Sequence, residues 1–191
     1  MLKKIIVAAL VVTSAVFAQT NIGARAAFNF GNIWGDHTED AQWGAGFNAG
    51  VAAKIDLTPM IAFVPGIEVD LRRITEDAPL FDEVSYSFWF IDMPFLARFN
   101  ITPQLFADAG LNLGFNLKAS QTIKLGGDSE TNDVDNAKSV DVGLVVGAGF
   151  TMIPNFDINF RFLLGFTDMV DMENVGSKNL RFQAGVTYWF M

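Results

Sequence analysis

Residues 105–117 read Leu105-Phe-Ala-Asp-Ala-Gly-Leu-Asn-Leu-Gly-Phe-Asn-Leu117, and every second residue of this stretch is apolar. From Asp108 onward the intervening positions hold Asp, Gly or Asn. Successive side chains of a strand point to opposite faces. This period of two therefore predicts a strand with one apolar face and one polar or small face.

The same alternation recurs in eight runs along the chain. The connections between them alternate between short turns that contain a proline and long polar loops, a pattern typical of antiparallel strands that run up and down. We therefore predict an all-β fold, an eight-stranded antiparallel up-and-down barrel. The runs are Ile22–Phe30, Trp43–Ile55, Ile61–Arg72, Ser87–Phe99, Leu105–Lys118, Val140–Thr151, Phe156–Thr167 and Leu180–Phe190. The short turns are expected at Leu57–Pro59, Ile101–Pro103 and Ile153–Asn155, and the long loops at Gly31–Ala41, Ile74–Glu83, Ala119–Lys138 and Asp168–Lys178.

The fourth run is the least regular. Asp92 and Arg98 share a face with Phe88, Phe90 and Leu96, so polar and large apolar residues are mixed on one side. An extra residue in one strand of a pair changes the local alternation. We expect a β-bulge near Phe90.

The apolar face is predicted to point outward. An eight-stranded barrel is just wide enough inside for its own side chains or one small ligand. It cannot enclose the large residues of a chain that is 51% hydrophobic, with mean hydropathy +0.30. The apolar run Ile5–Val12 is too short for a spanning helix, which needs about 20 residues. We therefore expect a transmembrane barrel, with a soluble periplasmic barrel of lipocalin type as the alternative.

Residues 1–18 have the pattern of a secretory signal peptide. Lys3 and Lys4 precede an apolar segment, and the segment up to Ala18 fits a cleavage site. The barrel domain is then 19–191, and loss of two lysines and no acid changes the formal charge from −8 to −10. An acidic chain is a poor partner for nucleic acid. The absence of Cys excludes a disulfide scaffold.

Thirteen charged residues fall on the inward face by parity. Charges in a narrow interior are costly unless they are paired. We predict a polar network that fills the lumen, and a narrow ion path is the alternative. The bases are Arg25, Lys54, Arg72, Arg98, Lys118, Arg161 and Arg181, and the acids are Glu68, Asp70, Asp92, Asp108, Asp141 and Asp157.

Four aromatic residues, Trp43, Trp89, Tyr188 and Phe190, fall near the predicted strand ends. Amphipathic rings favour the membrane–water interface, so we expect an aromatic girdle. By parity, Trp189 points inward near the periplasmic mouth. The outward face is predicted to carry no charge in the central part of any strand. The nearest exception is Arg73, at the extracellular end of its strand.

The long loops hold most of the acids. Fourteen of the 21 acidic residues lie there, which favours a solvated acidic rim at the cell surface. Attraction of cations, such as divalent ions that bridge to lipopolysaccharide, is the alternative. The segment Asp128–Asp133 partly matches a calcium loop but lacks the glycine at its sixth position. His37, the single histidine, lies beside Asp36, but proximity in sequence shows no catalytic geometry, and one histidine does not support a structural zinc site. We predict no enzymatic activity, no catalytic residues, no cofactor and no metal centre.

Two strand motifs carry a resemblance to a family. The segment Phe90-Ile-Asp-Met-Pro-Phe-Leu-Ala-Arg-Phe99 resembles the motif aromatic-Leu-Glu-Ile-Pro-Leu-Leu-Leu-Lys-Tyr of small outer-membrane β-barrel proteins, the porin family or PorT-like group. Val140-Asp-Val-Gly-Leu-Val-Val-Gly-Ala-Gly-Phe150 is similar to the same family's Asp-x-Gly-x-x-x-Gly-x-Gly strand. The resemblance implies a terminal aromatic that the barrel-assembly machinery recognises, whereas here Met191 follows Phe190.

The expected protein is a monomeric barrel in the bacterial outer membrane with both termini in the periplasm. Its partners would be lipid, lipopolysaccharide, the assembly machinery and a surface ligand or divalent cations at the acidic loops. The predicted role is structural or interactive at the cell surface, and a narrow porin-like channel is the alternative within the same fold.

Overall fold

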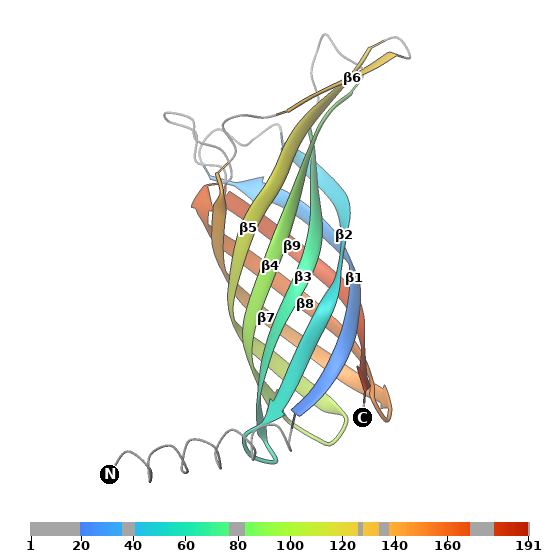
Figure 1. Ribbon diagram of the computed structural model, residues 1–191, viewed down its shortest axis with the longest axis vertical. Helices are drawn as coiled ribbons and strands as arrows, with labels where there is room; N and C mark the ends of the chain where they lie inside the picture. Colours follow the sequence, from blue (N-terminus) through green and yellow to red (C-terminus); the bar gives the residue numbers. More distant parts are fainter. Residues whose placement is uncertain are drawn as a thin grey trace, which may run out of the picture.

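Nine strands form one antiparallel sheet in the computed structural model (Figure 1), which describes residues 20–35, 41–76, 83–125, 128–133, 138–168 and 178–190. The predicted signal peptide lies outside the described residues. The strands are β1 (Thr20–Trp34), β2 (Ala41–Asp56), β3 (Ile61–Glu76), β4 (Glu83–Asn100), β5 (Leu105–Leu125), β6 (Asp128–Asp133), β7 (Val140–Ile153), β8 (Phe156–Asp168) and β9 (Lys178–Phe190).

Eight of these strands close into a barrel. Each pairs antiparallel with its neighbours in the chain; β1 pairs with β9, and β5 pairs with both β4 and β7. Closure leaves no unpaired sheet edge along the wall. The predicted eight-stranded barrel is confirmed, and the eight runs correspond to β1–β5 and β7–β9.

The ninth strand, β6, was not predicted. It lies within the expected loop Ala119–Lys138 and pairs with the upper part of β5, so that the two project beyond the rim (Figure 1). The segment Asp128–Asp133, which partly matched a calcium loop in the sequence, forms this strand, and its backbone pairs with that of β5. β3 and β5 likewise continue to Glu76 and Leu125, beyond their predicted ends. Apolar alternation stops where a strand leaves the apolar surroundings, although its backbone pairing continues.

The short turns all lie at the end of the barrel where the described chain begins and ends (Figure 1), here called the turn end; the opposite end is the loop end. Two of the turns repeat one design. In each, the Oγ1 of a threonine, Thr58 or Thr102, accepts hydrogen bonds from backbone N–H groups two and three residues later. The third turn places Asn155 after Pro154 with a φ of 69°, a backbone conformation that Asn and Gly tolerate best.

The two faces of the wall match the predicted parity. Large apolar side chains are exposed on the outside, for example Phe28 at 78% and Phe160 at 63% exposure, whereas the charged residues between them are buried. A soluble barrel of lipocalin type requires the opposite arrangement. Among the described residues, no helix is long and apolar enough to cross a membrane.

The expected bulge lies opposite Phe90. Trp89 pairs with Lys118 and Phe90 pairs with Asn116, so Leu117 is the extra residue, on β5. The bulge reverses the parity of β5 beyond it. Lys118 consequently points outward, where its side chain is 59% exposed and Nζ lies 3.1 Å from Asp133. The prediction that Lys118 belongs to the lumen network was wrong for this reason.

A substitution at Asn155 tests the turn. Asn155→Val should destabilise the barrel by about 1–2 kcal/mol, because a β-branched residue is disfavoured at this φ, whereas Asn155→Gly should retain stability. Urea unfolding of the protein in lipid vesicles measures both. Asn132→Val, on exposed β6, is the control, and an equal loss in this control and in Asn155→Val would contradict the explanation.

Candidate functional site

The lumen holds five arginines and six carboxylates, each at most 5% exposed. They come from seven of the eight barrel strands. The eighth, β2, contributes amide groups such as that of Asn48 and, at the turn end, the half-buried Lys54. Alternation places every second residue of each strand inside, so residues far apart in the sequence meet there. The arginines are Arg25, Arg72, Arg98, Arg161 and Arg181, and the acids are Glu68, Asp70, Asp92, Asp108, Asp141 and Asp157.

The cluster nearest the loop end is organised around Arg72. Its guanidinium lies 2.9 Å from Asp70, 2.6 Å from Asp92 and 2.5 Å from Asp141. Arg181 pairs with Asp70 and reaches Asp92 at 3.1 Å. Two arginines therefore hold three carboxylates, and the ring of Phe90 lies against the Arg72 guanidinium at 3.7 Å.

The central cluster spans the lumen through Arg25. Its Nη1 donates to Glu68 at 2.7 Å and to Asn48 at 2.8 Å, and its Nη2 donates to Asn159 and Gln183, each at 3.2 Å. Arg161 shares Glu68 from the opposite wall at 3.4 Å. These contacts join β1 to β2, β3, β8 and β9.

The cluster nearest the turn end contains Arg98. It makes a two-point contact with Asp108 at 2.9 and 3.1 Å and donates to Asp157 at 2.7 Å. Trp189 is buried, as predicted, and donates its indole N–H to the same Asp157 at 2.8 Å. Phe106 stacks on the Arg98 guanidinium at 3.5 Å. A Cβ on Gly149 would lie 2.2 Å from this ring, so the wall needs glycine there.

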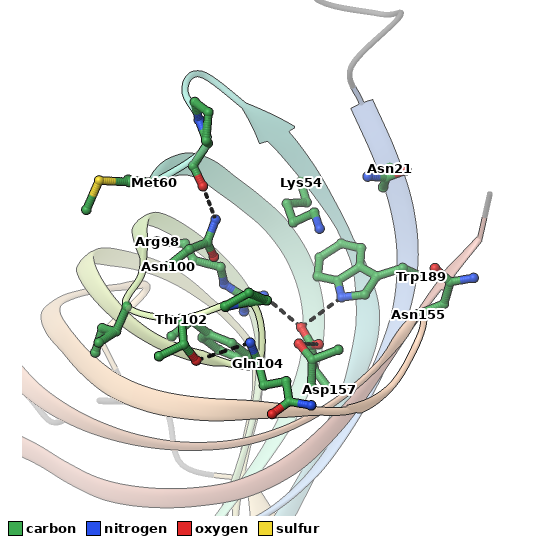
Figure 2. A pocket seen from close by; sticks show the side chains of 15 residues that line it. Asn21, Lys54, Met60, Arg98, Asn100, Thr102, Gln104, Asn155, Asp157 and Trp189 are labelled. Atoms are coloured by element: carbon green, nitrogen blue, oxygen red, sulfur yellow. Dashed lines mark hydrogen bonds and ion pairs between the residues drawn. The ribbon is translucent and has the colours of Figure 1, made fainter.

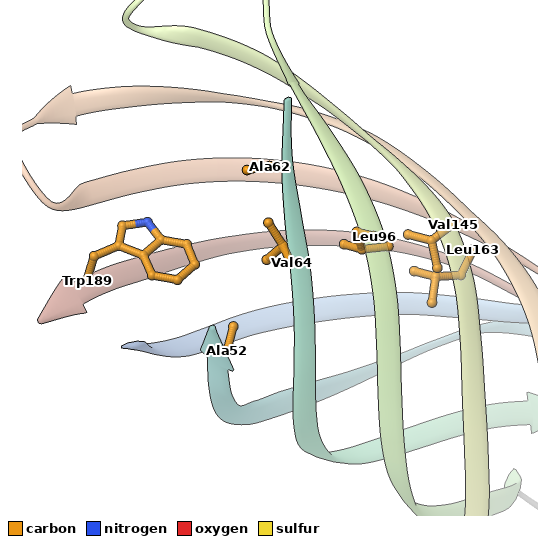
Figure 3. Close-up of a cluster of buried hydrophobic side chains, with 7 residues drawn as sticks. All are labelled: Ala52, Ala62, Val64, Leu96, Val145, Leu163 and Trp189. Atoms are coloured by element: carbon orange, nitrogen blue, oxygen red, sulfur yellow. The ribbon is translucent and has the colours of Figure 1, made fainter. Parts of the chain in front are cut away.

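Apolar residues also enter the lumen. Seven inward side chains form a cluster drawn in Figure 3, and a second cluster around Phe88 and Phe90 lies at the loop end. The lumen therefore contains apolar as well as polar side chains. The seven are Ala52, Ala62, Val64, Leu96, Val145, Leu163 and Trp189.

A cavity of about 580 Å³ opens at the turn end, below the Arg98 cluster (Figure 2). Lys54, Arg98, Phe106, Asp157 and Trp189 line it together with polar side chains of the turns. Lys54 was predicted to join the ion-pair network. It is half-buried, its Nζ lies 5.6 Å from the Trp189 ring centroid, and no ion pair joins it to a described residue.

The four predicted girdle residues lie on the outside of the wall. Trp43 is 47% exposed and packs near Phe182, and Trp89 is partly buried against Phe47. Tyr188 and Phe190 are each 49% exposed and contact one another at the turn end. The two tryptophans belong to the loop-end half of their strands, so the four rings lie near both ends of the barrel.

Several lumen partners were missed by the sequence reasoning, which counted charges only. Asn48, Asn159 and Gln183 complete the shell of Arg25, and Phe90 and Phe106 stack on guanidinium groups. Their inward parity was the available signal. His37 and eight of the fourteen loop acids, Asp36 among them, lie outside the described residues. Among the described residues no cluster of His, Asp or Glu could hold a metal ion.

Comparison with known proteins supports the architecture. Residues 17–171 match the outer membrane protein beta-barrel domain family. Similar solved structures include Ail of Yersinia pestis in complex with the heparin analogue sucrose octasulfate, with 14% identity, TM-score 0.55 and coverage of 90% of this chain and 99% of that chain. Neisserial surface protein A has 18% identity, TM-score 0.53 and coverage of 90% and 97%. OprG from Pseudomonas aeruginosa has 9% identity, TM-score 0.50 and coverage of 90% and 96%. No curated protein matches the sequence significantly.

Replacement of Arg98 tests the interior ion pairs. Arg98→Met leaves Asp157 buried without its counter-charge and leaves Asp108 only the more distant Arg161, at 3.7 Å, so it should destabilise the barrel by about 3–5 kcal/mol. Lys118→Met removes an exposed ion pair and should cost less than about 1 kcal/mol. Urea unfolding in lipid vesicles compares them, and similar losses for the two variants would show that the Arg98 pairs contribute no more than surface pairs.

Proposed function

This chain belongs to the outer membrane protein beta-barrel domain family, and on that premise we propose that its barrel is a filled scaffold with a structural or surface-interaction role. The protein is an integral β-barrel of the bacterial outer membrane. Its loop end is the part that would meet partners at the cell surface.

Ion pairs that cross the diameter of the barrel are the main support for this proposal. Around the barrel β4 lies opposite β9, and β3 lies opposite β8. Arg181 of β9 reaches Asp92 of β4 at 3.1 Å, and Arg161 of β8 reaches Glu68 of β3 at 3.4 Å. Direct contact between opposite walls at these two levels supports a filled lumen.

The outer surface suits lipid. Exposed Phe, Leu, Ile and Val side chains cover the wall, and the hydrocarbon core of a bilayer takes up such a surface without an unpaired backbone edge. We propose that Trp43, Trp89, Tyr188 and Phe190 form the interfacial girdle. Exposed positions of this kind near both ends of the wall support that role.

The orientation follows from the turns. Barrels of this class have short periplasmic turns and longer extracellular loops. The turn end and both termini would therefore face the periplasm after removal of a signal peptide at residues 1–18. We propose insertion by the barrel-assembly machinery and a monomeric state in contact with lipid and lipopolysaccharide.

The acidic loop end favours a cationic ligand or divalent cations that bridge to anionic groups. Ail binds a sulfated sugar. A polyanion of that kind is a poor direct partner for loops with fourteen acids, because like charges repel. Cation-mediated contact is therefore the form of surface interaction that we propose.

Conductance distinguishes a filled lumen from a narrow channel. In planar bilayers the purified protein should give no reproducible unit conductance. Glu68→Ala combined with Arg161→Ala keeps the net charge but removes a cross-lumen contact, and it should increase current. The pair Lys118→Ala and Asp133→Ala, outside the barrel, is the matched control. Unit conductance of the unchanged protein would favour the narrow channel.

A charge on the outer wall tests the lipid contact. Phe160→Lys, at an exposed position in the central part of β8, should destabilise the inserted protein by about 2–4 kcal/mol. Met60→Lys, in an exposed turn, should leave stability nearly unchanged. The measurement is urea unfolding in vesicles, and tolerance of lysine at both positions would argue against a membrane-embedded wall.

A further inference from the structure

We propose that the turn-end cavity binds a small hydroxylated carboxylate, with Lys54 as the residue that pairs with the carboxylate group. The cavity holds about 580 Å³, within the range of small-molecule sites. This site is separate from the filled lumen above it and from the loop end to which we assign surface interactions.

Lys54 differs from the other inward bases. Each of the five lumen arginines has at least one carboxylate within 3.4 Å, as the ion pairs above describe. Lys54 is half-buried on the same face of the wall and has no carboxylate partner among the described residues. An ammonium group in this position has lost part of its water without gaining a counter-charge, so an anion that enters the cavity would supply one.

The wall behind Lys54 is already fixed. Asp157 accepts hydrogen bonds from Arg98, Trp189 and Thr151, at 2.7, 2.8 and 2.7 Å. Figure 2 shows the Lys54 side chain beside the Trp189 ring, with Asp157 bonded to Arg98 and Trp189. Both oxygens of Asp157 have partners within the wall, and no ion pair joins Asp157 to Lys54. The site is therefore preformed, which lowers the entropy cost of binding.

The state of Lys54 favours a ligand with one carboxylate group. Arg98, the other cation that lines the cavity, is already paired with Asp108 and Asp157. Lys54 is therefore the cation of the lining that has no carboxylate partner among the described residues, and one carboxylate group on a ligand would supply that contact.

The remaining lining is mixed: it contains Pro59, Met60, Ile101 and Pro103, and it also offers hydrogen-bonding groups to a polar ligand. Amide groups of Asn21, Asn100, Gln104 and Asn155 and the hydroxyl of Thr102 surround the opening. Amides both donate and accept hydrogen bonds, as the hydroxyl groups of a sugar acid do. Phe106 and Trp189 provide ring surfaces against which a carbon chain can pack. A sugar acid satisfies the charge, the hydrogen bonds and the volume together.

The test uses the full protein in detergent and compares gluconate with glucose, which has a similar size and no charge. Calorimetry should detect saturable binding of gluconate and at least tenfold weaker binding of glucose. Lys54→Met should weaken gluconate binding at least tenfold, while Lys118→Met, at an exposed lysine outside the barrel, should leave it unchanged.

A second measurement, the fluorescence of Trp189, tests whether the ligand binds in this cavity. In a variant whose other tryptophans are Phe, the fluorescence of Trp189 should change with gluconate at the same midpoint as the heat signal. Absence of saturable gluconate binding, equal binding of glucose, or an unchanged affinity in Lys54→Met would each overturn the proposal. None of these outcomes bears on conductance, so the filled-lumen proposal is tested separately.

Discussion

A charge buried in a narrow barrel has to be paired, and this constraint organises the interior of the protein. The penalty for removing a guanidinium or carboxylate from water is recovered only through close contacts with good geometry. Arg72 meets this requirement for pairing through three carboxylates. Arg98 meets it through a two-point contact to Asp108 and a further bond to Asp157. Because the partners lie on different strands, the same contacts that neutralise the charges also brace the wall.

Small residues and rings make these contacts possible. Gly114 leaves room for Asp92 beside Arg72, since a Cβ on Gly114 would lie 2.6 Å from the Asp92 carboxylate. Gly149 leaves room for Phe106, which covers one face of Arg98. Glycine, aromatic ring and arginine thus act as one packing unit. Glycine at these two positions is therefore a consequence of fitting long inward side chains into an eight-stranded barrel.

Lys54 is the exception that gives the turn end a different character. Above Lys54, ion pairs join opposite walls of the barrel. Around Lys54, the side chains surround an open cavity, and its ammonium group has no carboxylate partner among the described residues.

The outer wall follows a related rule for the position of charges. Its charge-free apolar belt ends where Arg73 and Lys118 point outward on β3 and β5, both exposed at the loop end. Charge is therefore tolerated where water or a headgroup can reach it, and it is paired where neither can.

The sequence by itself determined the barrel, its strand number and which face of each strand points inward, because side-chain alternation and the lengths of connections are local properties. It also identified eleven of the thirteen proposed lumen charges as inward residues that the structure buries. Tertiary structure decided the features that a local sequence pattern does not specify, such as the bulge and the partners of each arginine. The bulge at Leu117 depends on the register between β4 and β5, and it moved Lys118 to the outside. The partners of each arginine depend on how the barrel closes, which brings Asp92 to Arg181 across 89 residues of sequence. Pairing and cavity shape arise from the distance between walls, and that distance exists only after closure.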